Sequence, residues 1–347
     1  MYNELMASIT KITRLPKTIK EMRAVLDALD VKKLNQEVQA ELQTYVAIVG
    51  TVNTGKSTLL NYLIGKSVSK VSAIPGTTRT NIQRRVGPFE LVDTPGFGDA
   101  AQPTRADVAR EAIQRADLNL LLMDATTGVR QVDVDLFNEL KATKQPLVIA
   151  LNKMDLVNPR EADTIVTMVE SKLGRNVIPI SARTGMNIAE RLIPRLIDEK
   201  PELAVVIGRA LPQYRTLVAQ RMIRKAATLS ALAGLEPIPG IDIPVLLIAQ
   251  VRLILRIAAL YGEEITTRTA RELIATIAGG VTLRYLGEEA SKLLPGPGWM
   301  LSAGFAAAGT YAIGQVARDY FESGKHLSIL QMRERYKRIV EERRKKK

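Results

Sequence analysis

The sequence predicts a doubly wound α/β domain with a mostly parallel sheet, preceded by a helical arm and followed by an all-α domain. Between Tyr45 and Lys200, short apolar segments alternate with longer amphipathic ones, which is the pattern of parallel strands with helices on both faces. Before this region, apolar residues recur at helical spacing, and beyond Pro201 the chain turns helical and alanine-rich. We therefore expect four parts: a helical arm (1–42), the α/β domain (43–200), an alanine-rich helical domain (201–330) and a basic helical tail (331–347).

The net charge of +13 is unevenly distributed along the 347 residues. Up to Lys200 there are 27 Lys and Arg against 23 Asp and Glu, and the rest of the chain has 22 against 13, most densely basic at 343–347. This excess favours a polyanionic partner, either nucleic acid or an anionic membrane face, although a solvated tail fits equally well. The absence of Cys excludes a disulfide framework, and residues 1–6 lack the pattern of a secretory signal, so we expect a cytoplasmic protein.

The first strand of the α/β domain leads into a loop with the composition of a phosphate-binding site. Residues 45–49 are uncharged and rich in β-branched side chains, as in a central parallel strand, and residues 57–64 have helical spacing and end at Gly65. The spacing Gly50, four residues, Gly55-Lys56-Ser57 is that of the P-loop, whose backbone N–H groups surround phosphate oxygens. Lys56 would reach the β- and γ-phosphates, and Ser57 would bind Mg²⁺. The alternative is a strand-turn-helix with chance glycines.

Polar residues follow the other expected strands at 89–92, 118–123, 146–151 and 177–180. Because ligands of open α/β sheets bind beyond the carboxyl ends of the strands, these residues should converge on the P-loop. After residue 92 comes Asp93-Thr94-Pro95-Gly96. Asp93 can hold Mg²⁺ through water, and the Gly96 N–H can meet a γ-phosphate that is present only before hydrolysis. The loop that follows would therefore sense the nucleotide state.

The later strands are followed by residues suited to a guanine base. In Asn152-Lys153-Met154-Asp155, the carboxylate can accept two N–H donors from the edge of guanine, and the Lys153 stem can cover the plane of the base. The backbone of Ser181-Ala182-Arg183 can bind the guanine carbonyl oxygen. Each short motif is weak alone, but their order and their placement at strand ends make the combination strong.

With these motifs the chain resembles the translation-factor-related P-loop GTPases, and within them the Era and TrmE group. The resemblance covers roughly residues 45–200 and also includes Pro75-Gly76-Thr77-Thr78-Arg79. It implies GTP hydrolysis, with Thr78 as the switch I threonine that closes on Mg²⁺ and the γ-phosphate, and Thr77 as the rival assignment. The residues it implies for catalysis are Lys56, Thr78 and Gly96; for Mg²⁺, Ser57, Thr78 and Asp93; and for the nucleotide, Gly50, Asn53, Thr54, Gly55, Lys56, Ser57, Thr58, Asn152, Lys153, Asp155, Ser181, Ala182 and Arg183.

Two positions of this match bear on mechanism. Phe97 stands where Ras-type enzymes place a water-orienting glutamine, and phenylalanine cannot hydrogen-bond a water, so hydrolysis driven by glutamine is excluded. Asn53 occupies the position at which members of this group bind potassium, so the resemblance implies stimulation by K⁺, strengthened when two G domains form a homodimer across their switch loops. Arg79, Arg105 and Arg130 are candidate arginine fingers, with a surface or structural role as the alternative.

Two segments of the second half are unusually apolar. Asp242-Ile243-Pro244 opens a helix that Gly262 closes, and residues 245–261 carry only Arg252 and Arg256 as charges. Such a helix is buried in a bundle or lies in a membrane. Residues 293–317 have no charge at all, which predicts a close-packed helix, with membrane insertion as the alternative.

This half resembles the uncharacterised helical domain that follows an Era-like GTPase in many bacterial proteins and is related to the YcjF type of membrane-associated protein. The resemblance spans about residues 211–328 and is carried by the segments 237–244, 250–251, 257–262 and 309–314. It implies association with a membrane and no chemistry. His326 has no Cys or acidic cluster beside it in the sequence, so a metal site is not expected there.

Together these patterns predict a Mg²⁺-dependent and K⁺-stimulated GTPase switch that its helical domain couples to a membrane surface or membrane protein. The alternative is an RNA- or ribosome-associated GTPase like Era. It is less expected because the second half lacks the GxxG loop of a KH domain and has few aromatic residues for base stacking. A third reading is a slow nucleotide-dependent scaffold, because the same residues bind GTP and Mg²⁺ whether or not turnover follows.

Overall fold

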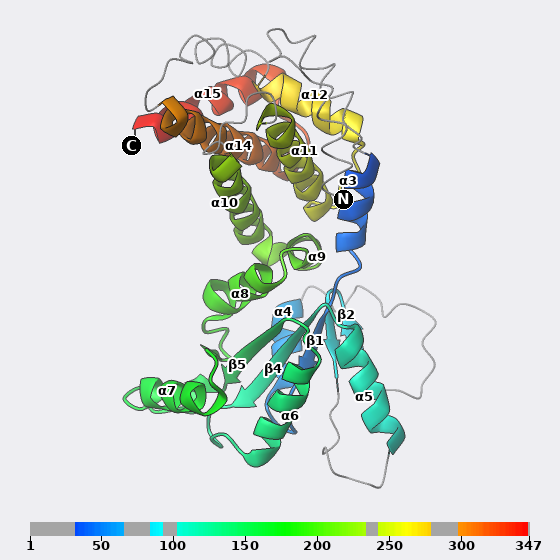
Figure 1. The fold of residues 1–347 in the computed structure, drawn as a ribbon, viewed down its shortest axis with the longest axis vertical. Helices are drawn as coiled ribbons and strands as arrows, with labels where there is room; N and C mark the ends of the chain where they lie inside the picture. Colours follow the sequence, from blue (N-terminus) through cyan, green and yellow to red (C-terminus); the bar gives the residue numbers. More distant parts are fainter. Residues whose placement is uncertain (1–31, 66–83, 93–102, 234–241, 279–297, 346–347) are drawn as a thin grey trace. The chain divides into compact units, whose positions relative to one another are not determined.

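The computed structural model describes residues 32–65, 84–92, 103–233, 242–278 and 298–345 (Figure 1). The chain divides into two compact units. The α/β unit is Glu41–Tyr214, and the helical unit comprises Met1–Ala40 and Arg215–Lys347. Several predicted features lie outside the described residues: most of the helical arm, the segments around Thr78 and Gly96, and the start of the uncharged segment at 293–297.

The α/β unit is built on a six-stranded sheet with the order β2-β3-β1-β4-β5-β6. Among the described strands, only β2 and β3 pair in antiparallel fashion, and the other pairs are parallel. The prediction of a mostly parallel sheet is therefore confirmed, and each predicted strand is present within a few residues of its expected bounds. The strands are β1 (Val46–Val49), β2 (Arg84–Val86), β3 (Phe89–Leu91), β4 (Leu118–Asp124), β5 (Leu147–Asn152) and β6 (Ile178–Pro179).

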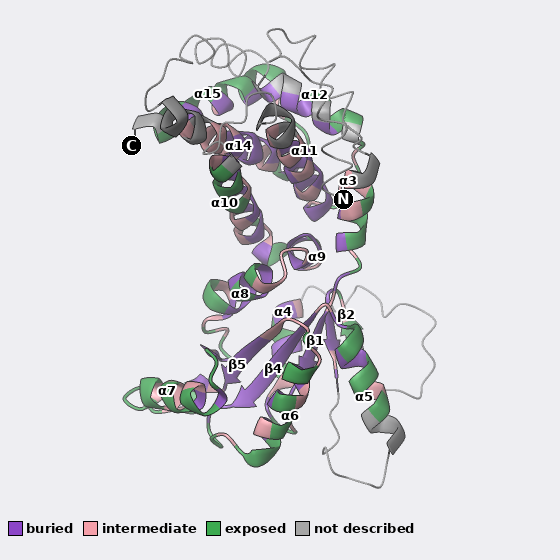
Figure 2. Cartoon of the chain, viewed as in Figure 1, coloured by how far each residue is buried: buried purple, intermediate pink, exposed green. Residues whose placement is uncertain are grey.

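The central strands form the core of this unit. Every residue of β1 and β4 is buried, as Figure 2 shows for the middle of the sheet, because helices cover both faces of a parallel sheet. Asn119 is polar yet fully buried in β4, and its amide donates to the Ile113 carbonyl oxygen at 3.3 Å. The last residue of β4 is Asp124, so a carboxylate stands at the carboxyl edge of the sheet beside the end of β5.

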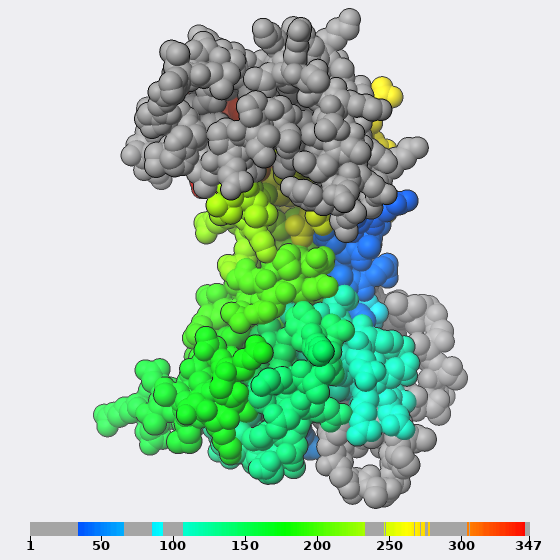
Figure 3. Space-filling model, viewed as in Figure 1, coloured from blue at the N-terminus to red at the C-terminus, as the bar shows by residue number. Residues whose placement is uncertain are grey.

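Helices pack against the sheet in the order expected of a doubly wound domain. Contacts join α4 to β3, α6 to β4 and α8 to β5, and α7 projects from the surface of this unit (Figure 3). A π-helical turn (Ile188–Leu192) leads into α8, and 3₁₀ turns lie at Met154–Leu156 and Pro212–Tyr214. The α-helices are α4 (Lys56–Ile64), α5 (Pro103–Arg115), α6 (Gln131–Ala142), α7 (Ala162–Leu173), α8 (Ile193–Glu199) and α9 (Leu203–Ala210).

The helical unit is a bundle in which α10, α11 and α14 pack on one another, and α15 packs on α14 and α12. The opening of α11 at Asp242 is confirmed, and its apolar circumference is largely buried. Among the described residues, no helix, α14 included, is long and apolar enough to cross a bilayer. The helices are α3 (Lys32–Glu41), α10 (Arg215–Ala233), α11 (Asp242–Leu260), α12 (Thr267–Ala278), α14 (Gly298–Glu322) and α15 (Ile329–Lys345).

Polar side chains inside this bundle bond to one another. Gln250 of α11 donates to the Thr310 hydroxyl of α14 at 3.2 Å, and that hydroxyl lies 3.0 Å from Ser230 of α10. Gln220 and Gln315 exchange two amide hydrogen bonds of 3.2 and 2.8 Å between α10 and α14. Because a buried polar group without a partner costs free energy, these pairs favour one register of the three helices over others.

Gly314 lets the same three helices approach closely. A Cβ atom at this position would lie 2.8 Å from the Cγ1 of Ile223 and 3.0 Å from the Cδ2 of Leu253. Both of those side chains are buried, so neither can move away without disturbing the core.

We predict that Gly314→Ala lowers the free energy of unfolding of the full chain by about 1–2 kcal/mol, because overpacking outweighs the gain in helix propensity. Gly309→Ala is the matched control on the same helix, since among the described residues its Cβ would meet only the Tyr336 hydroxyl, at 3.3 Å. Urea denaturation followed by circular dichroism measures both. A Gly314→Ala chain at least as stable as the Gly309→Ala chain would contradict this account of the packing.

Candidate functional site

The predicted P-loop joins β1 to α4, and its two glycines stand where no other side chain fits. A Cβ atom at Gly50 would overlap the Leu122 carbonyl oxygen and come within 2.9 Å of the Thr54 hydroxyl. Gly55 has a φ of 94°, and a Cβ atom there would overlap the Asn152 side-chain amide. The loop is therefore pressed against β4 and the end of β5, and we call its segment from Gly50 to Gly55 the cradle.

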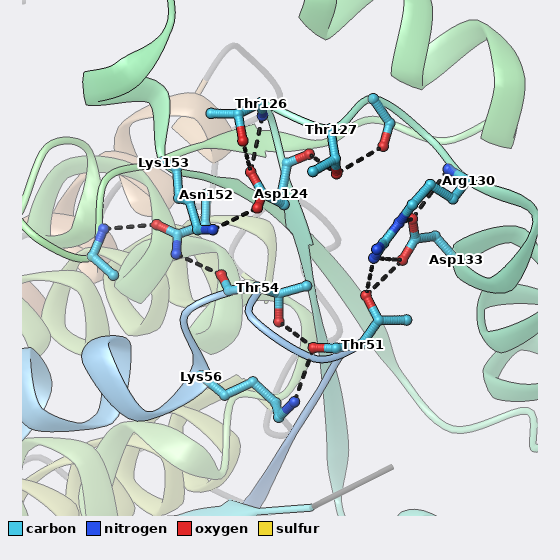
Figure 4. A network of polar contacts seen from close by, with 12 residues as sticks. Thr51, Thr54, Lys56, Asp124, Thr126, Thr127, Arg130, Asp133, Asn152 and Lys153 are labelled. Carbon is cyan, nitrogen blue, oxygen red and sulfur yellow. Dashed lines mark hydrogen bonds and ion pairs between the residues drawn. The ribbon is translucent and has the colours of Figure 1, made fainter. Parts of the chain in front are cut away.

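Lys56 folds back over this cradle (Figure 4). Its Nζ donates to the Gly50 carbonyl oxygen at 2.6 Å and to the Thr51 carbonyl oxygen at 3.1 Å, while the Thr54 hydroxyl donates to Thr51 O at 3.0 Å. The ammonium group thus stands over the loop backbone, where phosphate oxygens would be its stronger partners. Ser57 and Thr58 follow in the first turn of α4 and are exposed.

Asn152 connects the phosphate loop to the loop after β6. Its Nδ2 donates to the Thr54 carbonyl oxygen at 2.8 Å, and its Oδ1 accepts from the Ala182 N–H, also at 2.8 Å (Figure 4). The side chain is buried, with 2% exposed, so both bonds are shielded from water. One amide therefore brings together three motifs that are separated by about 130 residues of sequence.

Asp155 is fixed by the third of these motifs. Its Oδ1 accepts from the Ser181 hydroxyl at 2.6 Å, and Ser181 Oγ accepts in turn from the Thr184 N–H at 3.1 Å. The residue is nevertheless exposed, so its carboxylate remains accessible to a ligand. Arg183, between Ala182 and Thr184, is exposed and makes no hydrogen bond or ion pair within the described part of the chain.

Lys153 adopts a left-handed backbone with a φ of 67°, and its ammonium group pairs with Asp124 at the end of β4. Asp124 also accepts from the N–H and hydroxyl of Thr126 at 2.9 and 2.7 Å. Burial by itself would raise the pKa of Asp124, but the hydrogen bonds from Lys153 and Thr126 outweigh it and hold the pKa below its usual value. The role of Asp124 was not predicted, although an acidic residue at the carboxyl end of a central strand was a visible signal.

Arg130, a candidate arginine finger, belongs to a network beside the P-loop. Its guanidinium bonds to Asp133 at 3.1 and 3.2 Å and to the Thr51 hydroxyl, and Thr51 also donates to Asp133 at 2.8 Å. The hydrogen bond with Asp133 raises the pKa of Arg130 despite partial burial. In this arrangement Arg130 links the P-loop to the start of α6. This is a structural role, the alternative to an arginine finger.

The structure brings together the P-loop, Asn152, Asp155 and Ser181. Asn53 is exposed in the P-loop with a φ of 66°, a conformation that asparagine tolerates better than most residues. The predicted residues that lie outside the described part of the chain are Thr77, Thr78, Arg79, Asp93, Gly96 and Phe97.

Comparison with known proteins agrees with this geometry. Residues 45–153 match the family described as 50S ribosome-binding GTPase. In fold and in this match, this part of the chain resembles the P-loop GTPases. Residues 200–345 of the same chain match a family described as a domain of unknown function, DUF697. This match confirms the predicted resemblance of the second half to an uncharacterised domain, but not its relation to the YcjF type.

The similar proteins found by comparison match only part of the chain. The GTPase Era of Aquifex aeolicus is 32% identical over 174 residues, which cover 46% of this chain and 57% of Era. The GTPase Der of Paenarthrobacter aurescens is 31% identical over 206 residues, 56% of this chain and 41% of Der. A crystal structure of Era in complex with MgGDPNP and nucleotides 1506–1542 of 16S ribosomal RNA is 27% identical, covering 53% of this chain and 66% of that chain, with a TM-score of 0.36. The chain thus spans about half the length of the curated relatives it matches.

Proposed function

We propose that this chain binds GTP and hydrolyses it to GDP and phosphate, and that the cycle acts as a molecular switch. The observation that carries the proposal is the Asn152 amide, which bonds the phosphate loop through Thr54 and the base loop through Ala182. A nucleotide needs both loops at a fixed separation, because its phosphates and its base lie at opposite ends of one molecule. The residues present fit such a ligand at both ends.

At the phosphate end, the cradle between Gly50 and Gly55 would hold the β-phosphate through backbone N–H groups at the start of α4. Lys56 would exchange its bonds to two carbonyl oxygens for bonds to the β- and γ-phosphates. Ser57, with Thr78 and Asp93, would hold Mg²⁺. Bound there, Mg²⁺ would neutralise charge on the phosphate oxygens. Gly96 would meet the γ-phosphate through its N–H.

At the base end, Asp155 would accept the two N–H donors of guanine, and the backbone of Ala182 and Arg183 would face its carbonyl oxygen. The bond from Ser181 holds the Asp155 carboxylate in place before the base arrives, which lowers the entropic cost of binding. The ion pair with Asp124 fixes the ammonium group of Lys153. The aliphatic part of this side chain would then cover the plane of the base.

Potassium is the proposed second cation of the site. Asn53 is exposed in the loop that would wrap the phosphates, and its side-chain oxygen is a suitable ligand for a hard monovalent ion. A potassium ion there would supply the positive charge that an arginine finger supplies in other GTPases. We place this ion at the junction of two G domains in a nucleotide-dependent homodimer.

We assign coupling to an anionic membrane surface to the helical unit. All four charged residues of α10 are basic, and one face of this helix, the α10 stripe, carries Arg221, Lys225, Leu229 and Leu232 at spacings of four, four and three. Leu229 and Leu232 are each 56% exposed, which is unusual for leucine. Cations beside exposed leucines suit a lipid interface, where the leucines enter the acyl boundary and the cations meet phosphate groups.

RNA or the ribosome is the second candidate partner. It is favoured by the relatives named Era and by the basic excess of the second half. The α10 stripe argues against it, because it offers no aromatic ring on which a base could stack.

We also propose that the chain divides at residues 42, 200 and 330 into the helical arm, the α/β domain, the alanine-rich helical domain and the basic tail.

Asp155→Asn should weaken GDP binding by roughly 10- to 100-fold, because an amide cannot accept both guanine N–H groups, and should favour xanthosine diphosphate instead. Isothermal titration calorimetry with both nucleotides measures this. Asp163→Asn, an exposed aspartate in the first turn of α7, is the matched control and should leave both affinities unchanged. Unchanged GDP affinity in Asp155→Asn would overturn the guanine assignment.

Turnover should be several-fold faster in KCl than in NaCl at equal ionic strength, as phosphate release from GTP would show. Asn53→Gly should abolish that difference, because glycine fits the φ of 66° without strain and removes the amide oxygen. Equal turnover of the unsubstituted chain in the two salts would rule out the potassium site.

The full chain should sediment with vesicles that contain phosphatidylglycerol and not with neutral phosphatidylcholine vesicles. Replacing Leu229 and Leu232 by Gln should reduce the bound fraction, whereas Leu156→Gln, which removes a leucine that is 60% exposed in the α/β unit, should not. Binding to RNA with a steep salt dependence, without binding to vesicles, would replace the membrane proposal by the RNA alternative.

A further inference from the structure

The far end of α4 is tied to a segment 150 residues later in the sequence. Nε2 of Gln213 donates to the Leu63 carbonyl oxygen at 2.7 Å. Leu63 lies in the last turn of α4, where carbonyl groups have no partner within the helix. Gln213 therefore caps the helix whose first turn carries Lys56 and Ser57. It belongs to residues 210–214, here named the linker turn, which end the α/β unit and continue in sequence into α10.

Tyr62, in the same last turn of α4, supports the loop that would bind guanine. A Cβ atom at Gly185 would overlap the Tyr62 hydroxyl and come within 2.7 Å of its ring atom Cε2, so the phenol lies directly against the Gly185 backbone. Gly185 closes residues 181–185, here named the guanine turn, by donating its N–H to the Ser181 carbonyl oxygen at 2.8 Å. The guanine turn supplies the bonds that hold Asn152 and Asp155.

Tyr62 also neighbours the linker turn. Tyr214 is buried, and burial is the main cause that raises its pKa to about 12, with Tyr62 and Glu190 adding to the effect. The Tyr214 N–H bonds back to the Leu211 carbonyl oxygen at 2.9 Å. Gln213 thus sets the linker turn on the end of α4 through a hydrogen bond, and Tyr62 interacts electrostatically with Tyr214 of the same turn.

The start of the linker turn meets the turn between β2 and β3. A Cβ atom at Gly87 would lie 2.9 Å from the Cβ of Ala210, so the Gly87 backbone packs closely against the Ala210 side chain. From this turn β3 runs towards Asp93, the predicted Mg²⁺ residue. The linker turn therefore contacts two elements that lead to the phosphate end of the site, α4 and the β2–β3 turn.

We propose that Tyr62 and Gln213 are positioning residues that couple the nucleotide site to the linker turn. Tyr62 holds the guanine turn against α4, and Gln213 holds the linker turn on the same end of that helix. Any shift of α4 or of the guanine turn when a nucleotide binds therefore changes the position of residues 210–214. By thermodynamic linkage, a change in the position of the linker turn changes the free energy of nucleotide binding by the same amount. This inference rests on the proposed binding of a guanine nucleotide.

The first test is the rate at which a fluorescent GDP analogue dissociates from the full chain. Gln213→Ala and Tyr62→Ala should each speed dissociation roughly 2- to 10-fold, the value of one hydrogen bond or a comparable contact, and Tyr62→Phe, which keeps the ring, should change it less. Gln145→Ala is the matched control, because Gln145 donates at 3.2 Å to the Gln114 carbonyl oxygen near the end of α5, away from the guanine turn. Rates equal to that of the unsubstituted chain in both Gln213→Ala and Tyr62→Ala would overturn the coupling.

A second readout needs no nucleotide and separates this inference from the proposed function. In the nucleotide-free chain, Tyr62→Ala should speed hydrogen exchange roughly 2- to 10-fold at the amides of both Gly185 and Tyr214, which lie in different turns. The amide of Gly174, bonded to Glu170 O at 2.8 Å at the end of α7, should be unaffected. Faster exchange at both turns in a chain that binds no GDP would refute the proposed function alone. Unchanged exchange at either turn would refute the coupling itself.

Discussion

The proposed nucleotide site depends on one buried side-chain amide. Asn152 bonds to Thr54 in the phosphate loop and to Ala182 in the guanine turn, so the two ends of the site are placed relative to each other by a single residue at the end of β5. The need for glycine at position 55 follows from this arrangement, since a Cβ atom there would overlap the Asn152 amide. Burial makes both bonds strong and makes the loss of either costly.

Much of this unit could be predicted from the sequence, because its signals are local. The strands β1, β4 and β5 are uninterrupted apolar runs, and the P-loop glycines have a fixed spacing. The strand β2 could not be predicted, since three residues that include two arginines carry no period of two. Contacts such as Asp124 with Lys153, Thr51 with Asp133, or Gln213 with Leu63 join residues far apart in the chain, and neither partner signals the other in the sequence.

The interior of the helical unit could be predicted only in part. Its apolar helices were expected to pack closely, and they do, yet the sequence could not show which polar residues would be buried. The structure pairs Gln220 with Gln315 and links Gln250 through Thr310 to Ser230, with Gly314 bringing the helices together. The basic and apolar α10 stripe is the surface of this bundle for which we propose a partner.

The central claim is that the chain hydrolyses GTP at the loop between β1 and α4, and release of inorganic phosphate by the full-length chain tests it most directly. In Mg²⁺ and KCl, the account predicts saturable release from GTP, none from ATP at the same concentration, and loss of the GTP signal in Lys56→Ala. Release from ATP at a rate equal to that from GTP, or no release from GTP at all, would contradict it.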